Sequence, residues 1–251
     1  MTVAALVLAG SRGGADPLAA YAGVADKALI EIEGETMLAR VVAALRAAGI
    51  TRIAVSASSV AVADHARTLG AEPFDAASGP SASTRDGLDR LGAPLLLTTA
   101  DHALLEPGWV RQFLASVPAD ADVSALLARR EVVVDAAPGT QRTYLRFADG
   151  DWSGCNLFYF ATPRAAAAID LWRRVEADRK RPWRIVRLLG PGVLLRYALG
   201  RLTLAEAVAR LGRAAGITAA IVAAADGRAA IDVDKPADLD LVRAMRRGVS
   251  G

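Results

Sequence analysis

An uninterrupted apolar run at residues 3–8, VAALVL, constrains the fold of this chain most strongly. Six apolar residues in a row, closed by Ala9 and Gly10, are typical of a strand that is buried on both faces of a parallel sheet. Similar runs follow at 52–56, 94–99 and 123–128, and segments with helical spacing lie between them. This alternation predicts a three-layer α/β sandwich with a mainly parallel, mixed sheet.

The same periodicities predict the remaining elements. Strands are expected at 28–32, 71–74, 144–147, 157–160, 217–223 and 229–233, and helices at 36–48, 60–69, 83–91, 107–116 and 236–245. A helical insertion is expected at about 163–212, with helices at 165–176, 183–189, 193–199 and 204–211. Because strand character returns after the insertion, residues 1–251 are expected to form a single domain.

Composition narrows the function classes. The formal charge of +3, from 30 basic and 27 acidic residues, is too small to imply nucleic-acid binding. One cysteine cannot form an internal disulfide, and two histidines do not provide a usual structural zinc site. No signal peptide is recognised, and no apolar run approaches the ~20 residues that span a bilayer. We therefore expect a soluble, cytoplasmic protein.

The predicted helical insertion is both basic and apolar, and its role is left open. It is expected to pack against the sheet, with a lid, a dimer surface and a peripheral membrane contact as alternatives. The chain is expected to be a monomer or a homodimer, and no transmembrane segment is predicted.

The first loop is a candidate phosphate-binding segment. The stretch LAGSRG comprises Leu8, Ala9, Gly10, Ser11, Arg12 and Gly13. Small residues directly after a strand let the backbone N–H groups approach phosphates closely. A plain tight turn explains the loop equally well, because neither common nucleotide fingerprint is present. Lys27 stands where its ammonium could reach back over the same phosphates, and a solvated lysine is the alternative.

Two aspartates suggest a metal site. Asp101 follows the predicted strand at 94–99 and so lies at the carboxyl edge of the sheet, where open α/β folds bind ligands. Asp234 is expected at the end of another strand, just before the helix that Pro236 opens. If these strand ends are adjacent, both carboxylates can hold one Mg²⁺, with Asp232 as a reserve ligand. For Asp101, a helix N-cap is the alternative.

Five segments in order resemble the MobA-like NTP transferases: LVLAGSRGG, Lys27 with ALIEIEGETML, TTADHALL, SGCNLFYF and IDVDKPADLDLV. The resemblance covers nearly the whole chain and implies a Rossmann-like nucleotide-diphospho-sugar transferase fold. It assigns the NTP to residues 8–13 and Lys27, and Mg²⁺, with Mn²⁺ as a substitute, to Asp101 and Asp234. Two departures stand out: LAGS replaces the usual LAGG, and Asp16 and Pro17 lengthen the first loop.

The resemblance also assigns substrate contacts. Gly79 and Ser83 match the place where relatives meet the base and ribose, although an N-cap at Ser81 or Ser83 is equally compatible. Gly154 and Asn156 match the loop that receives the acceptor. Charge alone adds further candidates for an acceptor-phosphate patch, namely Arg142, Arg146, Lys180 and Arg181.

These features predict a nucleotidyltransferase that moves a nucleoside monophosphate from an NTP to a small phosphorylated acceptor and releases pyrophosphate. CTP and GTP are the favoured nucleotides, and Arg12, Lys27 and Asp101 are the candidate catalytic residues. His102 is more easily interpreted as structural. One alternative is a non-catalytic nucleotide-binding module, which the paired aspartates disfavour. The other is a glycosyltransferase that uses a nucleotide sugar, which the lack of a suitable Asp-x-Asp disfavours.

Overall fold

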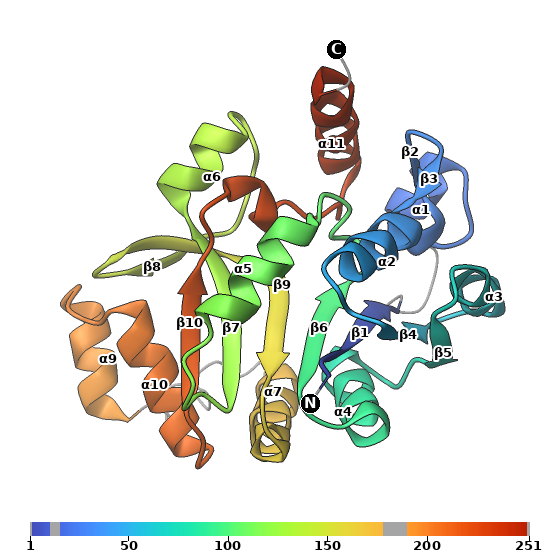
Figure 1. The fold of residues 1–251 in the computed structure, drawn as a ribbon. Helices are drawn as coiled ribbons and strands as arrows, with labels where there is room; N and C mark the ends of the chain where they lie inside the picture. Colours follow the sequence, from blue (N-terminus) through green and yellow to red (C-terminus); the bar gives the residue numbers. More distant parts are fainter. Residues whose placement is uncertain (1, 11–15, 178–189, 250–251) are drawn as a thin grey trace.

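One mixed sheet of eight strands organises the computed structural model, which describes residues 2–10, 16–177 and 190–249 (Figure 1). Its strands lie in the order β10-β7-β9-β6-β1-β4-β5, and β8 pairs with β9 off this path. The strands are β1 Ala4–Ala9, β4 Arg52–Ala57, β5 Glu72–Asp75, β6 Leu95–Thr99, β7 Val123–Arg129, β8 Leu145–Phe147, β9 Gly150–Phe160 and β10 Ala219–Ala223. All pairings are parallel except those of β9. The predicted α/β fold class is confirmed.

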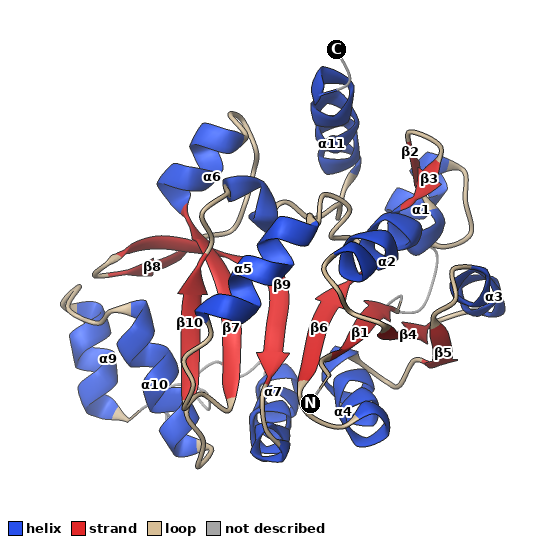
Figure 2. Cartoon of the chain, viewed as in Figure 1, coloured by secondary structure: helices blue, strands red, loops and turns tan. Residues whose placement is uncertain are grey.

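Helices cover both faces of this sheet (Figure 2). They are α1 Pro17–Ala22, α2 Met37–Ala47, α3 Val60–Thr68, α4 Pro80–Leu91, α5 Pro107–Ser116, α6 Arg130–Ala136, α7 Ala166–Ala177, α9 Pro191–Ala198, α10 Leu204–Ala214 and α11 Pro236–Val249. Along β1, Ala5 and Val7 face the core beneath α2 and α5, whereas Leu6 faces the core beneath α4 and α7. Burial of alternate residues on opposite faces explains the uninterrupted apolar run.

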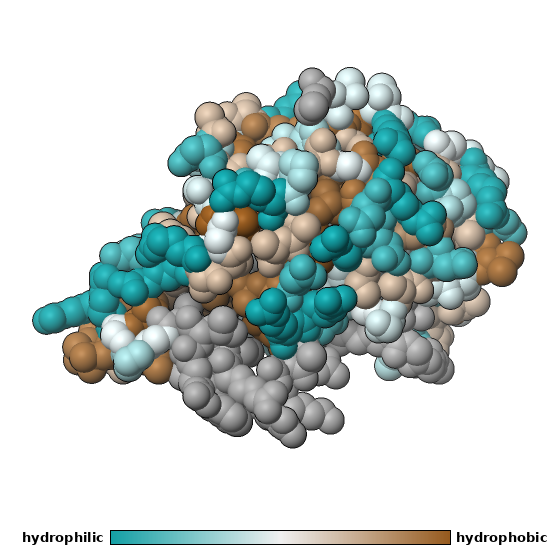
Figure 3. Space-filling model, turned by 90° about the horizontal axis from the view of Figure 1, so that it is seen from below, coloured by the Kyte–Doolittle hydropathy of each residue, from teal (hydrophilic) through white to brown (hydrophobic). Residues whose placement is uncertain are grey.

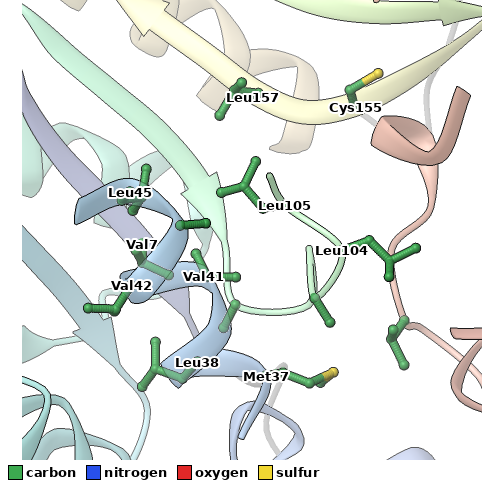
Figure 4. Close-up of a cluster of buried hydrophobic side chains, with 14 of the residues drawn as sticks. Val7, Met37, Leu38, Val41, Val42, Leu45, Leu104, Leu105, Cys155 and Leu157 are labelled. Atoms are coloured by element: carbon green, nitrogen blue, oxygen red, sulfur yellow. The ribbon is translucent and has the colours of Figure 1, made fainter. Parts of the chain in front are cut away.

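The larger core lies between the sheet and α2, α3 and α5. Figure 4 shows part of it, where Val41 of α2 lies near Val7, and Leu105 lies near Leu157 of β9. All four of the residues Val7, Leu38, Val41 and Leu157 have no exposed surface. Each such buried side chain stabilises the fold by roughly 1.5–3 kcal/mol relative to an exposed one. This core fixes the sheet edge on which the site is built.

Two predicted strands are wrong. Residues 28–32 form a 3-10 helix, η1 Lys27–Leu29, followed by a short strand, β2 Glu31–Ile32, that pairs only with β3 Glu35–Thr36. Residues 229–233 begin in another 3-10 helix, η3 Gly227–Ala230, and continue as extended chain outside the sheet. Most apolar side chains of both segments are buried, but the backbone of neither segment forms hydrogen-bonded pairs with a strand of the main sheet. Burial without strand pairing explains why the apolar pattern was misleading.

Helices α7, α9 and α10 form the described part of the predicted insertion, and the helix predicted at 183–189 lies outside the described residues. A capping box between Thr203 and Glu206 starts α10. Leu204 packs on Leu127 and Trp152 of the sheet, in agreement with the expected packing. Exposed apolar side chains remain on α9, at Leu195, Tyr197 and Leu199, and apolar surface is visible at that end of the molecule (Figure 3). None of the described helices is long and apolar enough to cross a membrane.

Candidate active site

Lys27, Asp101 and Asp234 meet at the carboxyl edge of the sheet. The Lys27 ammonium donates to Asp101 Oδ2 at 2.6 Å and to Asp234 Oδ1 at 2.7 Å. Lys27 opens η1, Asp101 lies just after β6, and Asp234 lies just before α11. The N–H of Ala100 donates to the Leu8 carbonyl at 2.9 Å, which keeps this corner against the end of β1. The two carboxylates are thus joined through one nitrogen atom.

Burial and the neighbouring carboxylates determine the protonation state of Lys27. Its side chain is 22% exposed, that of Asp101 is 15% exposed, and that of Asp234 is 62% exposed. Burial alone would lower the pKa of Lys27, but the two carboxylates outweigh burial and raise this pKa above its ordinary value. Burial raises the pKa of Asp101, while the Lys27 ammonium and the Thr99 hydroxyl act in the opposite direction. Lys27 is therefore a stable cation between a shielded and an accessible carboxylate.

The segment that carries Asp234 is positioned by hydrogen bonds instead of by strand pairing. The Val233 N–H donates to the Asp101 carbonyl at 3.0 Å. The Asp238 carboxylate, in the first turn of α11, accepts from the N–H groups of Asp234 and Lys235 at 3.2 and 3.1 Å, and thereby ties the chain before the helix to its first turn. Pro236 supplies the first position of that helix. These bonds keep Asp234 within reach of Lys27.

Asp232, the predicted reserve metal ligand, is bonded elsewhere. Its carboxylate is buried and accepts from Arg142 and from Asn156 Nδ2, the latter at 2.8 Å. Burial alone would lower the pKa of Arg142, but Asp232 outweighs it and raises that pKa. Asp232 thus forms a buried ion pair, and the two carboxylates that meet at Lys27 are those of Asp101 and Asp234.

A polar cleft of about 330 Å³ opens beside these carboxylates. Its walls are formed by Gln141, Arg142, Thr143, Ser153, Gly154, Asn156, Asp234, Lys235 and Asp238. The structure therefore brings three predicted acceptor residues, Arg142, Gly154 and Asn156, to one cleft together with Asp234, whereas the predicted residues Lys180 and Arg181 lie outside the described residues. Gln141 and Lys235 were missed by the sequence analysis. The position of Lys235 next to Asp234 in the sequence could have indicated that it belongs to the site. Nothing in the sequence around Gln141 indicated its place in the cleft.

The first loop is described only at its start. Gly10 is exposed at the end of β1, and a β-carbon placed on it would lie 3.7 Å from Ala76, so the loop begins against the segment that leads to Gly79. Gly79 is the N-cap of α4, and the Ser83 hydroxyl accepts from the Ala77 N–H at 2.9 Å. Ser11, Arg12 and Gly13 lie outside the described residues. Gly10 and the N-cap Gly79 thus lie at the end of β1 and at the start of α4, whereas Ser83 is buried and bonded within its own turn.

The two carboxylates are also candidate metal ligands. Within residues 2–10, 16–177 and 190–249, no group of three or more His, Cys, Asp or Glu side chains is arranged to hold a metal ion. The pair formed by Asp101 and Asp234 nevertheless fits Mg²⁺, because that ion binds proteins through one or two carboxylates and completes its shell with water and substrate phosphates. This donor set therefore suits Mg²⁺ whose remaining positions are filled by water or phosphate oxygens.

His102 lies beside Asp101 in sequence but points into the core. It is 1% exposed, and its ring stacks on Trp109 with centroids 6.3 Å apart. Burial lowers the pKa of His102 to about 4, against a weaker opposing effect of Asp232. His102 is thus neutral at physiological pH and structural, as the sequence favoured.

Known proteins match this chain in sequence and in fold. The family model described as the MobA-like NTP transferase domain matches residues 5–188. The chain belongs to this family. It is therefore a nucleotidyltransferase-type enzyme, and the resemblance drawn from the five sequence segments is confirmed.

Solved structures agree with this assignment. A hypothetical transferase from Thermus thermophilus is 33% identical, with a TM-score of 0.79, over 95% of this chain and 100% of that chain. A CMP:2-keto-3-deoxy-manno-octonic acid synthetase complexed with CTP is 16% identical, with a TM-score of 0.61, over 99% of this chain and 100% of that chain. A 2-C-methyl-D-erythritol 4-phosphate cytidylyltransferase, also from Thermus thermophilus, is 17% identical, with a TM-score of 0.56, over 98% and 100%. The last two show a shared fold. No curated protein matches this transferase.

Proposed function

We propose that this transferase moves a nucleoside monophosphate from an NTP to a small phosphorylated acceptor and releases pyrophosphate, with Mg²⁺ as its cofactor. The observation that carries the proposal is the junction of Lys27 with Asp101 and Asp234, the last of which also lines the polar cleft. A cation and two carboxylates of this kind suit a reaction in which two anionic substrates must be held together.

The chemistry requires positioning more than proton transfer. An oxygen of the acceptor phosphate attacks the α-phosphorus of the NTP, a new P–O bond forms, and the bond to the β-phosphate oxygen breaks to release pyrophosphate. Because the acceptor phosphate is already ionised at neutral pH, no strong general base is needed. Lys27 keeps its charge through its two carboxylate partners and is suited to offset the repulsion between the substrates.

The proposed roles follow from where the side chains lie. Asp101 and Asp234 would hold Mg²⁺, which neutralises charge on the triphosphate when bound. The rim with Gly10 and Gly79 would receive the NTP, and Arg12 is proposed as a further phosphate ligand. Lys235 and Gly154, in the cleft on the other side of Asp234, would face the acceptor. CTP and GTP are the proposed nucleotides.

Pyrophosphate release provides the test. The chain is incubated with each of the four NTPs, Mg²⁺ and a panel of sugar phosphates and phosphorylated alcohols. We expect release that requires both an NTP and an acceptor, and its loss on addition of EDTA. NTP binding without release from any acceptor would instead indicate a non-catalytic module, and consumption of a nucleotide sugar would indicate a glycosyltransferase.

The matched variants are Asp101→Asn and Asp64→Asn. Asp64 forms an exposed ion pair on α3, where its side chain is 64% exposed. Asp101→Asn should lower kcat/KM on the order of 100-fold or more, because it removes a charge in contact with Lys27 and the proposed cation. Asp64→Asn should retain wild-type activity. An Asp101→Asn variant as active as Asp64→Asn would refute the assignment of the metal site.

A further inference from the structure

Asn156 interrupts the regular conformation of strand β9. It belongs to β9, yet its φ of 47° is left-handed, a conformation that few residues other than glycine adopt. The pairing of β7 with β9 shifts register between Ala125 and Leu127, which places Asn156 in an irregularity of the strand. Such bulges redirect a side chain out of the regular alternation. Asn156 is also the single asparagine of the 251 residues.

The redirected amide reaches Asp232. Asn156 Nδ2 donates to Asp232 Oδ2 at 2.8 Å, while Arg142 donates to Asp232 Oδ1. The Asp232 side chain is 12% exposed, so both of its oxygens are held by donors in a largely buried setting. Arg142 balances the charge of Asp232, and the neutral amide fixes the direction in which the carboxylate points.

Asp232 belongs to the extended segment that also carries Asp234. This segment, residues 231–235, forms no strand with the sheet. Besides the donors to Asp232, it is held by the bond from the Val233 N–H to the Asp101 carbonyl and by the bonds to the Asp238 carboxylate. The hydrogen bonds to Asp232 hold the backbone two residues before Asp234 and so limit where the Asp234 carboxylate can lie. If Asp232 lost these bonds, Asp234 could move away from Lys27.

We propose that Asn156 is a positioning residue, which acts through Asp232 to hold the Asp234 carboxylate against Lys27 and Asp101. This inference rests on the proposed function for its effect on turnover. It differs from the expectation that Asn156 contacts the acceptor, and the two roles predict different kinetics. A positioning residue controls kcat, whereas an acceptor ligand controls the KM for the acceptor.

The variant that tests the role is Asn156→Gly. Glycine adopts a positive φ without strain, and therefore this substitution removes the amide while keeping the backbone conformation. In the full chain without metal, we expect faster amide hydrogen exchange in peptides that cover residues 231–238, by about 10-fold, and unchanged exchange in peptides that cover 52–57. In the complete reaction we expect kcat to fall by about 10–100-fold, with the KM values for NTP and acceptor within about threefold of wild type.

Thr162→Val is the matched control. Thr162 donates to the buried carboxylate of Asp122 at 2.6 Å, beyond the far end of β9. This variant therefore also removes one donor to a buried aspartate, but at the opposite edge of the sheet. It should lower the stability without changing kcat or the exchange of residues 231–238.

A charge exchange adds a rescue test. Asn156→Asp alone places two carboxylates face to face, and adding Asp232→Asn restores an amide–carboxylate bond in the reverse direction. We expect the double variant to recover at least 10-fold of the kcat lost by Asn156→Asp.

Three outcomes decide the matter. Unchanged exchange at 231–238 in Asn156→Gly overturns the proposal, and so does a raised acceptor KM with an unchanged kcat. Faster exchange supports the positioning of this segment even if wild type turns over no phosphorylated acceptor, and that combination would refute only the proposed function.

Discussion

Among the glycines that the structure describes, Gly227 is the one at which a single methyl group should disturb the fold most. It opens η3, the short helix that leads into the segment with Asp232 and Asp234. A β-carbon built on Gly227 would lie 2.1 Å from the Val132 carbonyl oxygen and 2.5 Å from the Val132 carbonyl carbon. These atoms belong to the backbone of α6, so they cannot rotate away as a flexible side chain would. The Gly227→Ala variant must therefore separate η3 from α6.

The expected cost follows from this overlap. Overpacking a buried site costs about 1–3 kcal/mol, and a clash with rigid backbone belongs at the upper end of that range. A loss of about 3 kcal/mol in a chain of this size lowers the Tm by roughly 6–12 °C. Because η3 must move, we also expect lower nucleotidyl transfer at temperatures where the variant remains folded.

Thermal and urea denaturation of the two alanine variants Gly227→Ala and Gly108→Ala would test this prediction. Gly108 lies in the first turn of α5, and a β-carbon there meets no atom within 4 Å. Gly108→Ala should be as stable as wild type or slightly more stable, since alanine is the better helix former. A Gly227→Ala protein that melts together with wild type would show that η3 does not pack on α6 as described.

Two further predictions concern the ionisable groups. Lys27→Met should lower the free energy of unfolding at pH 7 by about 2 kcal/mol, because it leaves Asp101 and Asp234 facing each other without a cation. Burial raises the pKa of Asp101, so the loss should shrink as the pH falls and this carboxyl protonates. Urea denaturation at pH 7 and pH 4 checks this, with Arg67→Met as the exposed control, and an equal loss at both pH values would contradict it. The pKa of His102 is about 4 in the folded protein and 6.5 in the unfolded chain. As the pH falls, the unfolded state therefore binds the proton first, and the folded state loses stability relative to it. Between pH 6.5 and pH 4, in EDTA, the free energy of unfolding should fall by roughly 3 kcal/mol. His102→Phe should remove that part of the pH dependence, and identical slopes for wild type and variant would contradict the neutral buried state.

The sequence was informative where burial and strand pairing coincide. The runs at 3–8 and 94–99 became β1 and β6, because strands covered on both faces are apolar throughout. Asp101 could therefore be placed at the carboxyl edge of the sheet. Lys27 and Asp234 were expected near the same edge, and the structure shows both in contact with each other there, with Lys27 also bonded to Asp101.

Residues 229–233 show why other parts were missed. The pattern AAIDV is apolar because η3 and the following chain are buried, and composition does not reveal whether backbone groups find a ladder partner. Helix α6 was missed because its sequence, REVVVDA, is short and β-branched, which resembles a strand. The pairing of Asn156 with Asp232 joins residues 76 positions apart through a bulge, and no local pattern announces such a contact.

The reversed direction of β9 determines where the chain that follows it leaves the sheet. Asp101 follows the last residue of β6, whereas β9, which runs antiparallel to β6, contributes Gly154 and Asn156 from its middle. The chain that leaves β9 after Phe160 consequently departs from the opposite rim, where Phe160 pairs with Leu95 and Val123. The chain between β9 and β10 therefore starts on the side away from the aspartates that meet Lys27, and α7 brings it back to the start of α4, where Glu176 accepts from the Ser81 hydroxyl.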